Sequence, residues 1–361
     1  MIFPRCYWAA LGLLVIASPA FAQGPIVPTG TPGPTMKTLD QVEARKPVPA
    51  GALASAYLIT EPGSYYLTGN IAVTDANNGV TIQADNVTLD LNGFTISNTS
   101  TNVDPSAANG GVNILGARTN VTVRNGSVVS TTTVSGTTFS NVGFYNGVFA
   151  SALARNVLVE GVSVQGTRCG IMVFEVDPNT AVQTGGGVVL NCRVNVVATT
   201  GITAALIKGC TALACGTTAI NGIMVSDCFG SSPGGSGITG STVSQSQGES
   251  SASSVNTYGI RGVTVLNCYG SHMGVGVGLN GQTVTGSRGI SFNGNGLTAL
   301  SATTCFGTST SAIGLETTIA NNCYGATSTG TGLKAVIAVA CTANAGSGGT
   351  PFAITNKYNM P

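Results

Sequence analysis

Hydrophobic and polar residues alternate with a period of two in short runs from Tyr57 onwards. The clearest runs lie at 63–71, 80–82, 87–91 and 94–96, and Asp85-Asn86 and Asn92-Gly93 separate them. A period of two rich in β-branched residues predicts strands, and these polar pairs predict tight turns. The front half of the chain therefore predicts short, closely spaced strands.

A second pattern, with a period near 18 residues, runs through the back half. Nine small residues lie 18, 18, 18, 22, 19, 18, 18 and 18 positions apart, and an aliphatic residue, from Ile202 to Leu333, stands eight positions before each member after the first. Gly stands one position earlier still in seven cases and Ala219 in the other. We call the nine residues the cysteine ladder: Cys192, Cys210, Cys228, Ser246, Cys268, Ser287, Cys305, Cys323 and Cys341. Stacked columns at a fixed period predict a solenoid, in which each coil buries its inner face against its neighbours.

The extra residues in this frame all fall on one side of the predicted coil. Four lie between Ser246 and Cys268 and one between Cys268 and Ser287, after the ladder residue and before the Gly. One side of the solenoid is thus predicted to be regular and the other to carry loops, and loops on one face often mark the binding face of a repeat protein.

The first 22 residues are typical of a secretory signal. Arg5 precedes an apolar run at 9–16, and small residues end the segment at Ala20 and Ala22. No second run reaches the ~20 apolar residues of a membrane-spanning helix. We expect a secreted protein, extracellular or at the cell surface, with no membrane span.

One elongated domain is predicted over 57–350, with further segments on either side of it. Residues 23–35 hold four Pro and three Gly and predict an extended linker, and 36–56 predict an N-terminal cap with a short helix at 38–43. Residues 351–361 predict a short C-terminal tail. A poorly covered last coil would be a template for another subunit, so end-to-end self-association is an expected alternative.

Composition limits the partners. Charged residues make up only 7% of the chain and the net charge is +1, which disfavours nucleic acid. The hydrophobic share of 43% indicates an ordered chain despite 51 Gly.

The cysteines pose a question about disulfides, because export leads to an oxidising compartment. Neighbouring coils lie ~4.8 Å apart, whereas a disulfide requires Cβ atoms about 3.5–4.5 Å apart. We therefore expect the ladder to be buried free thiols that act as small hydrophobes. Cys169 and Cys215 lie off the ladder and are the candidates for a bridge. With one histidine, His272, predicted in a loop, and no Cys-x-x-Cys, we expect no metal site and no cofactor.

Three stretches support a resemblance to a known family: 63–70, 85–96, and the Val-x-Asn-Cys turns at 189–192 and 265–268. Over roughly 57–345 the chain resembles secreted bacterial right-handed β-helix repeat proteins of the pectin-lyase-like superfamily. The resemblance implies an all-β, single-stranded, right-handed parallel β-helix. It does not imply one function, since this fold hosts lyases, hydrolases, epimerases and adhesins.

The family's enzymes act on acidic polysaccharides, and glycoside hydrolysis needs a close pair of carboxylates. Between 192 and 341 the only acids are Asp227, Glu249 and Glu316, in different positions of the repeat. The Asp-rich and Gly-His-Gly motifs of polygalacturonases are missing, as are the calcium-binding Asp cluster and paired arginines of pectate lyases. Asp85 and Asp90 fit turn residues better than catalytic acids.

A charge cluster between 118 and 208 offers the candidates for a lyase, in which an Arg could act as base. If Thr167 precedes Cys192 in the ladder, Arg168 and Arg193 share a column and need an anion between them. That anion is either a bound acidic sugar or a carboxylate of the chain. The candidates are Arg168, Arg193, Glu160, Glu175 and Asp177.

A row of aromatic residues follows the ladder by one position, interrupted by Gln247 and Arg288. Its members are Phe229, Tyr269, Phe306 and Tyr324. If the ladder points inward, this row points outward and suits a glycan or a protein partner. The Gly that follows each aromatic residue offers an alternative, in which a backbone kink turns the rings back to pack at a corner.

These observations favour a secreted, non-catalytic β-helix protein, an extracellular structural or surface component that contacts glycans. The alternatives are a polysaccharide lyase or related carbohydrate-active enzyme, and a self-assembling extracellular fibre subunit.

Overall fold

The computed structural model describes residues 45–49, 51, 55–100, 109–140, 143–173 and 186–359. The predicted signal, linker and helix at 38–43 lie outside these residues, as do Glu175 and Asp177.

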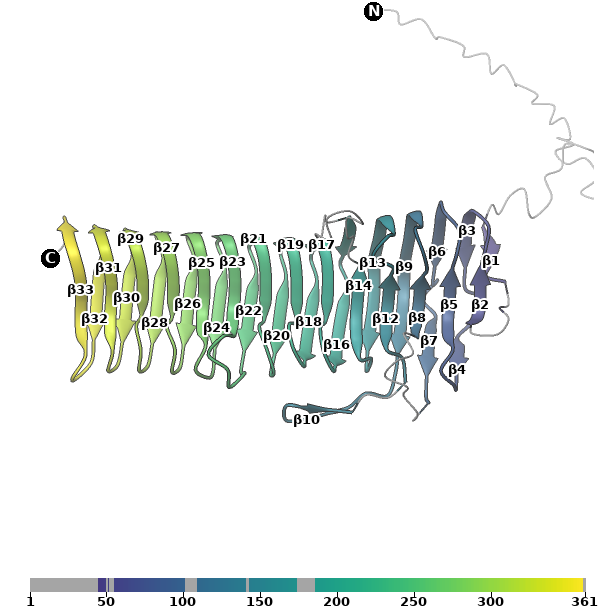
Figure 1. Ribbon diagram of the computed structural model, residues 1–361, viewed down its shortest axis with the longest axis horizontal. Helices are drawn as coiled ribbons and strands as arrows, with labels where there is room; N and C mark the ends of the chain where they lie inside the picture. The colour runs from purple at the N-terminus through teal and green to yellow at the C-terminus, as the bar shows by residue number, and fades with distance from the viewer. Residues whose placement is uncertain are drawn as a thin grey trace, which may run out of the picture. The chain divides into compact units, whose positions relative to one another are not determined.

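From Arg45 onwards the described chain forms one stack of coils (Figure 1). Thirty-one strands of the described residues join in a single sheet, in which the paired strands run parallel from coil to coil, and β10 (Val134–Ser135) and β11 (Thr138–Phe139) form a separate antiparallel pair. Parallel pairing of each coil with the next confirms the predicted parallel β-helix.

Three faces make up each coil. The first face contains β2 (Ser55–Ile59), β5 (Asn78–Ile82), β8 (Gly110–Ile114), β12 (Asn146–Ala150) and β14 (Cys169–Val173). The second face contains β1 (Lys46–Pro47), β3 (Gly63–Tyr66), β6 (Val87–Asp90) and β15 (Gly187–Leu190). The third face contains β4 (Ile71–Val73), β7 (Thr95–Asn98), β16 (Arg193–Val197), β18 (Thr211–Cys215), β20 (Phe229–Ser232), β22 (Gln247–Ser250), β24 (Tyr269–His272), β26 (Arg288–Ser291), β28 (Phe306–Ser309), β30 (Tyr324–Thr327) and β32 (Thr342–Ala345).

Some strands continue through two faces. The second and third faces share β9 (Thr119–Val129) and β13 (Arg155–Gln165). The first and second faces share β17 (Ile202–Lys208), β19 (Ile220–Ser226), β21 (Ile238–Ser244), β23 (Tyr258–Leu266), β25 (Val277–Thr285), β27 (Leu297–Thr303), β29 (Leu315–Asn321), β31 (Thr331–Val339) and β33 (Thr350–Tyr358).

The corner between the first and second faces changes along the stack. In three early coils it holds Asn86, Asn120 and Asn156, each with a positive φ of 51–59°, a backbone conformation that asparagine tolerates. Their side chains form a ladder, in which Nδ2 of Asn120 donates to Oδ1 of Asn86 at 2.8 Å and Nδ2 of Asn156 donates to Oδ1 of Asn120 at 2.6 Å. From β17 on, the strand passes this corner without a break.

The core is a set of aliphatic columns. The predicted column from Ile202 to Leu333 is confirmed, because its members pair in register from coil to coil and are fully buried. The column also extends towards the N-terminus through Val80, Val112 and Ile171.

Glycine recurs at two positions of the repeat, one on the first face, as at Gly259 and Gly278, and one on the third face, as at Gly248 and Gly270. In these glycine columns the first and third faces approach each other closely. A Cβ on Gly278 would lie 2.3 Å from the carbonyl oxygen of Ile290, and a Cβ on Gly248 would lie 2.2 Å from that of Gly259. Only glycine allows this contact between the two walls. The glycines after the aromatic row are thus required by packing inside the coil, and the rings themselves lie half-buried on the outer side.

Loops gather at the corner between the third and first faces. The β10–β11 hairpin lies between β9 and β12, and the four extra residues of the longest repeat lie between β22 and β23. The predicted separation of a regular side from a looped side is observed for these segments.

The segment from 351, predicted as a tail, forms most of β33, which pairs in parallel with β31. Lys357 stands opposite the buried Ala338, in an inward column, with its Nζ 5.0 Å from the ring centroid of Phe352. A charge in that column disfavours the addition of another coil. End-to-end association stays a prediction.

The inward and outward assignments can be tested with adjacent residues. Ile238→Asp should lower the free energy of unfolding by about 3–5 kcal/mol, because it places an unpaired charge in the buried column. Thr239→Asp, on the outer side, should cost within about 1 kcal/mol. Denaturant titration of both variants measures the difference, and equal losses would contradict the assignment.

Candidate functional site: the cysteine ladder and its groove

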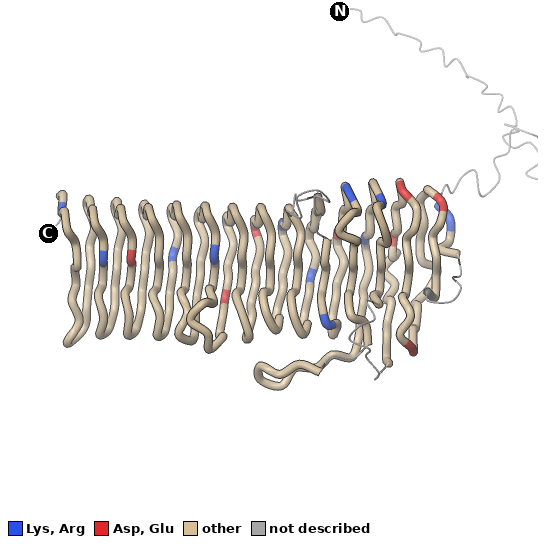
Figure 2. The backbone as a smooth tube through the Cα atoms, in the orientation of Figure 1, with Lys and Arg blue, Asp and Glu red and all other residues tan. Residues whose placement is uncertain are grey.

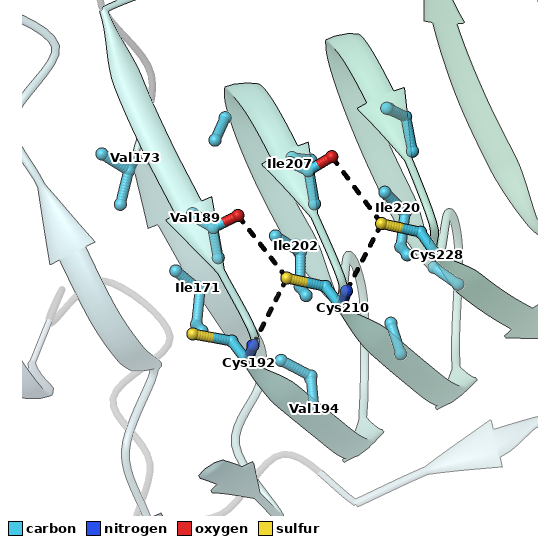
Figure 3. Close-up of a cluster of buried hydrophobic side chains, with 14 of the residues drawn as sticks. Ile171, Val173, Val189, Cys192, Val194, Ile202, Ile207, Cys210, Ile220 and Cys228 are labelled. Carbon is cyan, nitrogen blue, oxygen red and sulfur yellow. Dashed lines mark hydrogen bonds between the residues drawn. The ribbon is translucent and has the colours of Figure 1, made fainter. Parts of the chain in front are cut away.

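The cysteine ladder lies at the corner between the second and third faces. The residue before each ladder member turns this corner with a positive φ, as at Asn191 (52°), Asp227 (55°) and Asn267 (52°). The N–H of each ladder cysteine from Cys192 to Cys323 then donates to the side chain of the next ladder member. The acceptor is Sγ of Cys210 for Cys192, and Sγ of Cys228 for Cys210, both at 3.4 Å (Figure 3).

Each ladder side chain also donates. The thiols donate to the carbonyl two residues earlier at 3.0–3.3 Å, and Ser246 and Ser287 donate to the equivalent carbonyls at 2.7 and 2.8 Å. Either cysteine or serine can occupy a ladder position because each carries, on a single side-chain atom, a donor and an acceptor. The thiols were predicted as small hydrophobes, and the structure adds this hydrogen-bonding role.

The nine described cysteines are buried and free. Burial raises the pKa of the Cys215 and Cys268 thiols. Cys169 opens β14 on the first face and Cys215 ends β18 on the third face, so these two off-ladder residues do not pair in register.

A shallow groove of about 780 Å³ follows the outer side of the ladder. One wall consists of the corner residues Asp227, Gln245 and Asn267, and the other begins with Phe229 and Gln247. Tyr269 and Arg288 extend the second wall over two further coils. Carboxylate, amide and guanidinium groups therefore alternate with aromatic rings along an open hollow.

The aromatic row forms one column with Gln247 and Arg288, as its register shows. Phe306 and Tyr324 stack on each other, with centroids 4.7 Å apart and planes at 19°. The guanidinium of Arg288 lies 4.9 Å from the Phe306 centroid and 6.0 Å from that of Tyr269. At the C-terminal end of the row, the faces of Phe306 and Tyr324 are thus partly covered by each other and by the Arg288 guanidinium. Phe229 and Tyr269 flank Gln247, whose Nε2 donates to Glu249 Oε1 at 2.9 Å.

Two of the lyase candidates, Arg168 and Arg193, do not share a column as the sequence suggested. Arg193 pairs with Ser163, and the N–H of Val162 donates to Cys192 Sγ, so Val162 holds the ladder position before Cys192 and Thr167 does not. Arg168 lies at the other end of the third face, with its guanidinium carbon 4.6 Å from the Tyr145 centroid. The column of two stacked arginines is therefore absent.

Glu160 belongs to a column of charged residues on the second face, in which it follows Arg124 and Asp90. Arg124 Nε lies 3.1 Å from Asp90 Oδ2, and Arg45 Nη1 lies 3.9 Å from the same oxygen. Asp90 Oδ1 also accepts the N–H of Asn92 at 2.9 Å. This buried acid stabilises a turn and a stack of strands, which agrees with the structural reading of Asp90.

Charged side chains are sparse along the rest of the stack (Figure 2). Lys208 Nζ lies 4.0 Å from Asp227 Oδ2 beside the groove, and Lys334 Nζ lies 2.8 Å from Glu316 Oε1 on the first face. Within the described ranges, no three His, Cys, Asp or Glu side chains cluster as a metal site would require. The same residues include no helix of the length and apolarity that a membrane crossing needs.

His272 was predicted in a loop, and the structure corrects this. It ends β24 and is 1% exposed. It stands in a column of buried hydroxyl residues, four positions after each ladder member: Ser232, Ser250, Ser291, Ser309 and Thr327. That spacing, visible in the sequence, is the signal that could have placed it.

The corner residues of the groove were also missed by sequence reasoning. Asp227, Gln245 and Asn267 each precede a ladder member, so the ladder itself marks them. Asn267 was taken only as part of a turn, and Asp227 was considered only as an isolated acid.

Comparison of the sequence with protein-family models, with curated proteins and with solved structures gave no match. The class of the protein follows from its own geometry: it is a parallel β-helix with a thiol and hydroxyl ladder at one corner and a shallow groove outside that ladder.

The hydrogen-bonding role of the ladder can be tested at Cys210. Cys210→Ser retains a donor and an acceptor and should change the free energy of unfolding by less than about 1 kcal/mol. Cys210→Ala removes the acceptor for the Cys192 N–H and should cost about 1–3 kcal/mol. Denaturant unfolding under reducing conditions compares the two, and equal losses would mean that the thiol only fills space.

Proposed function

We propose that this chain is an exported, non-catalytic protein of an extracellular or cell-surface layer, and that it binds polysaccharide in the groove beside the cysteine ladder. The lining of the groove supports this proposal most directly. Its amide and carboxylate groups can exchange hydrogen bonds with sugar hydroxyls, and its aromatic rings offer rigid apolar contact area. The groove is open and elongated over several coils, which suits an extended chain better than a small molecule.

The balance of charge in the groove favours a glycan of low charge. Asp227 is next to Lys208, and Arg288 is next to the rings of Tyr269 and Phe306. Neither sign of charge dominates, so we expect neutral polysaccharides to bind better than strongly acidic ones.

Relationship to the pectin-lyase-like superfamily is part of this proposal. Its support is the resemblance of the runs at 63–70 and 85–96, which form β3, β6 and the turns and strands around them. The signal-like residues 1–22 support export.

Non-catalytic function is supported by the separation of the candidates that sequence reasoning had placed together. Arg168 and Arg193 lie at opposite ends of the third face. Asp227, Glu249 and Glu316 lie on separate coils, and Glu249 and Glu316 have amide or ammonium partners.

The binding prediction concerns Tyr269 and Gln247. Tyr269→Ala and Gln247→Ala should each weaken binding to a neutral insoluble polysaccharide about tenfold, or ~1.4 kcal/mol. Co-sedimentation across a panel of neutral and acidic polysaccharides measures this. Tyr258→Ala is the matched control, because Tyr258 also lies beside an arginine, Arg261 at 5.2 Å, but on the first face. Equal losses in all three variants, or no binding to any polysaccharide, would contradict the proposal.

The same panel tests the lyase alternative. We expect no unsaturated product by ultraviolet absorbance and no release of reducing sugar. Product formation that disappears in Arg168→Ala or Arg193→Ala would overturn the non-catalytic assignment and locate the active site on the third face.

A further inference from the structure

His272 is held by two hydrogen bonds inside the stack. The N–H of Gly274 donates to its Nδ1 at 3.0 Å, and its Nε2 lies 2.8 Å from Oγ1 of Thr257. Thr257 Oγ1 donates its own proton to the carbonyl of Ser254 at 2.5 Å, so the Nε2–H of the ring is the donor to Thr257. The ring is therefore neutral, with its proton on Nε2.

The surroundings are shaped for this ring. A Cβ on Gly276 would lie 2.4 Å from His272 Nε2, and a Cβ on Gly274 would lie 3.2 Å from its Cε1. Thr257 ends the loop 251–257, which contains the four extra residues of this coil. At the turns after β20, β26, β28 and β30 a hydroxyl accepts the N–H three residues further on, whereas at the turn after β24 the His272 imidazole accepts the N–H of Gly274 and its partner Thr257 ends the longer loop one coil earlier.

We propose that His272 is an acid-sensitive latch that fastens the loop 251–257 to the body of the β-helix and releases it when the ring takes up a proton. A proton on Nδ1 would face the N–H of Gly274, and the two donors repel. The turn at 273–276 must then move, and with it the bond to Thr257.

The charged groups on the neighbouring strands do not replace the lost bond. Glu249 on β22, Arg261 on β23 and Arg288 on β26 occupy outward positions of their strands, whereas the ring points inward. Ser250 and Ser291, the neighbours of His272 in its own column, carry no charge. Burial lowers the pKa of His272, which keeps the ring neutral in the folded state.

The direction of the pH effect follows from this. The unfolded chain takes up a proton near pH 6.5, the ordinary value for histidine, and the folded chain only at lower pH. The stability that the neutral ring supplies is complete above about pH 6.5 and is lost as the pH falls from there towards the folded pKa.

Release of the loop would change the surface at this corner. Val255, Met273 and Val275 are exposed by 65%, 68% and 39%, and they lie on the loop and on the turn that the latch joins. An acid-dependent rearrangement here would alter the exposure of these apolar side chains on the looped side of the molecule, away from the polysaccharide groove.

The test uses the complete untagged protein, in which His272 is the only histidine. Its ring proton resonances, followed by NMR over pH 4–8, report one titration directly. Amide exchange, corrected for its intrinsic pH dependence, should show protection falling at least about tenfold through that titration at Gly274 and Val277, whose N–H groups donate to His272 Nδ1 and to the carbonyl of Thr257 at the end of the loop. The turn at 232–235, which is built on Ser232, is the internal control and should not respond.

His272→Asn is the matched variant, because an asparagine oxygen can accept the Gly274 N–H in an Asx turn but does not titrate. Its loop protection should be independent of pH. An unshifted titration near 6.5, an unresponsive loop in the wild type, or the same pH dependence in His272→Asn would each overturn the proposal. Polysaccharide binding near neutral pH should be the same in this variant, so failure of the latch and failure of the proposed function are distinguishable.

Discussion

The hydrogen bonds between successive coils hold every column of side chains in register, and the other features depend on that register. Because each residue lies directly over its counterpart, one choice of side chain is repeated along the stack and packs against copies of itself. The aliphatic column, the asparagine corner and the ladder of thiols and hydroxyls are all consequences. The glycine columns follow from the same register. Where two backbone walls approach too closely for a Cβ in one coil, they do so in the next coils too, and glycine is required in each.

The ladder also determines which residues line the groove on the surface. A left-handed residue at the corner removes the next N–H from the strand pairing, and the side chain one coil further on accepts it. The same turn points the left-handed residue outward, so that the polar wall of the groove and the buried ladder arise from adjacent positions. The groove is thus a by-product of the way in which the coil turns its corner, and its chemistry can vary without disturbing the core.

The regular part of the fold could be predicted from the sequence because a repeat presents the same evidence many times. The column from Ile202 to Leu333 is an example. The sequence-based assignment of ladder positions failed where the position holds a residue of a common type. Val162 occupies the ladder position before Cys192, but a valine there does not differ from the other valines of the strand. Thr167 was therefore chosen instead. His272 was assigned to a loop because no acid or nucleophile stands near it in the sequence, and its spacing from Cys268, which matches the spacing of buried Ser and Thr residues in other coils, was not used. The stacking of Phe306 on Tyr324 and the position of Arg288 between rings depend on side-chain geometry, which a sequence pattern does not encode.

The continuous strands that begin at β17 have a consequence for how such a molecule changes over evolutionary time. Each coil from there on presents nearly the same upper and lower surface to its neighbours. Duplication or loss of one 18-residue segment would therefore replace one set of contacts with an equivalent set. The length of the groove could grow or shrink by whole coils in single genetic events, while the loop corner diversifies independently by small insertions.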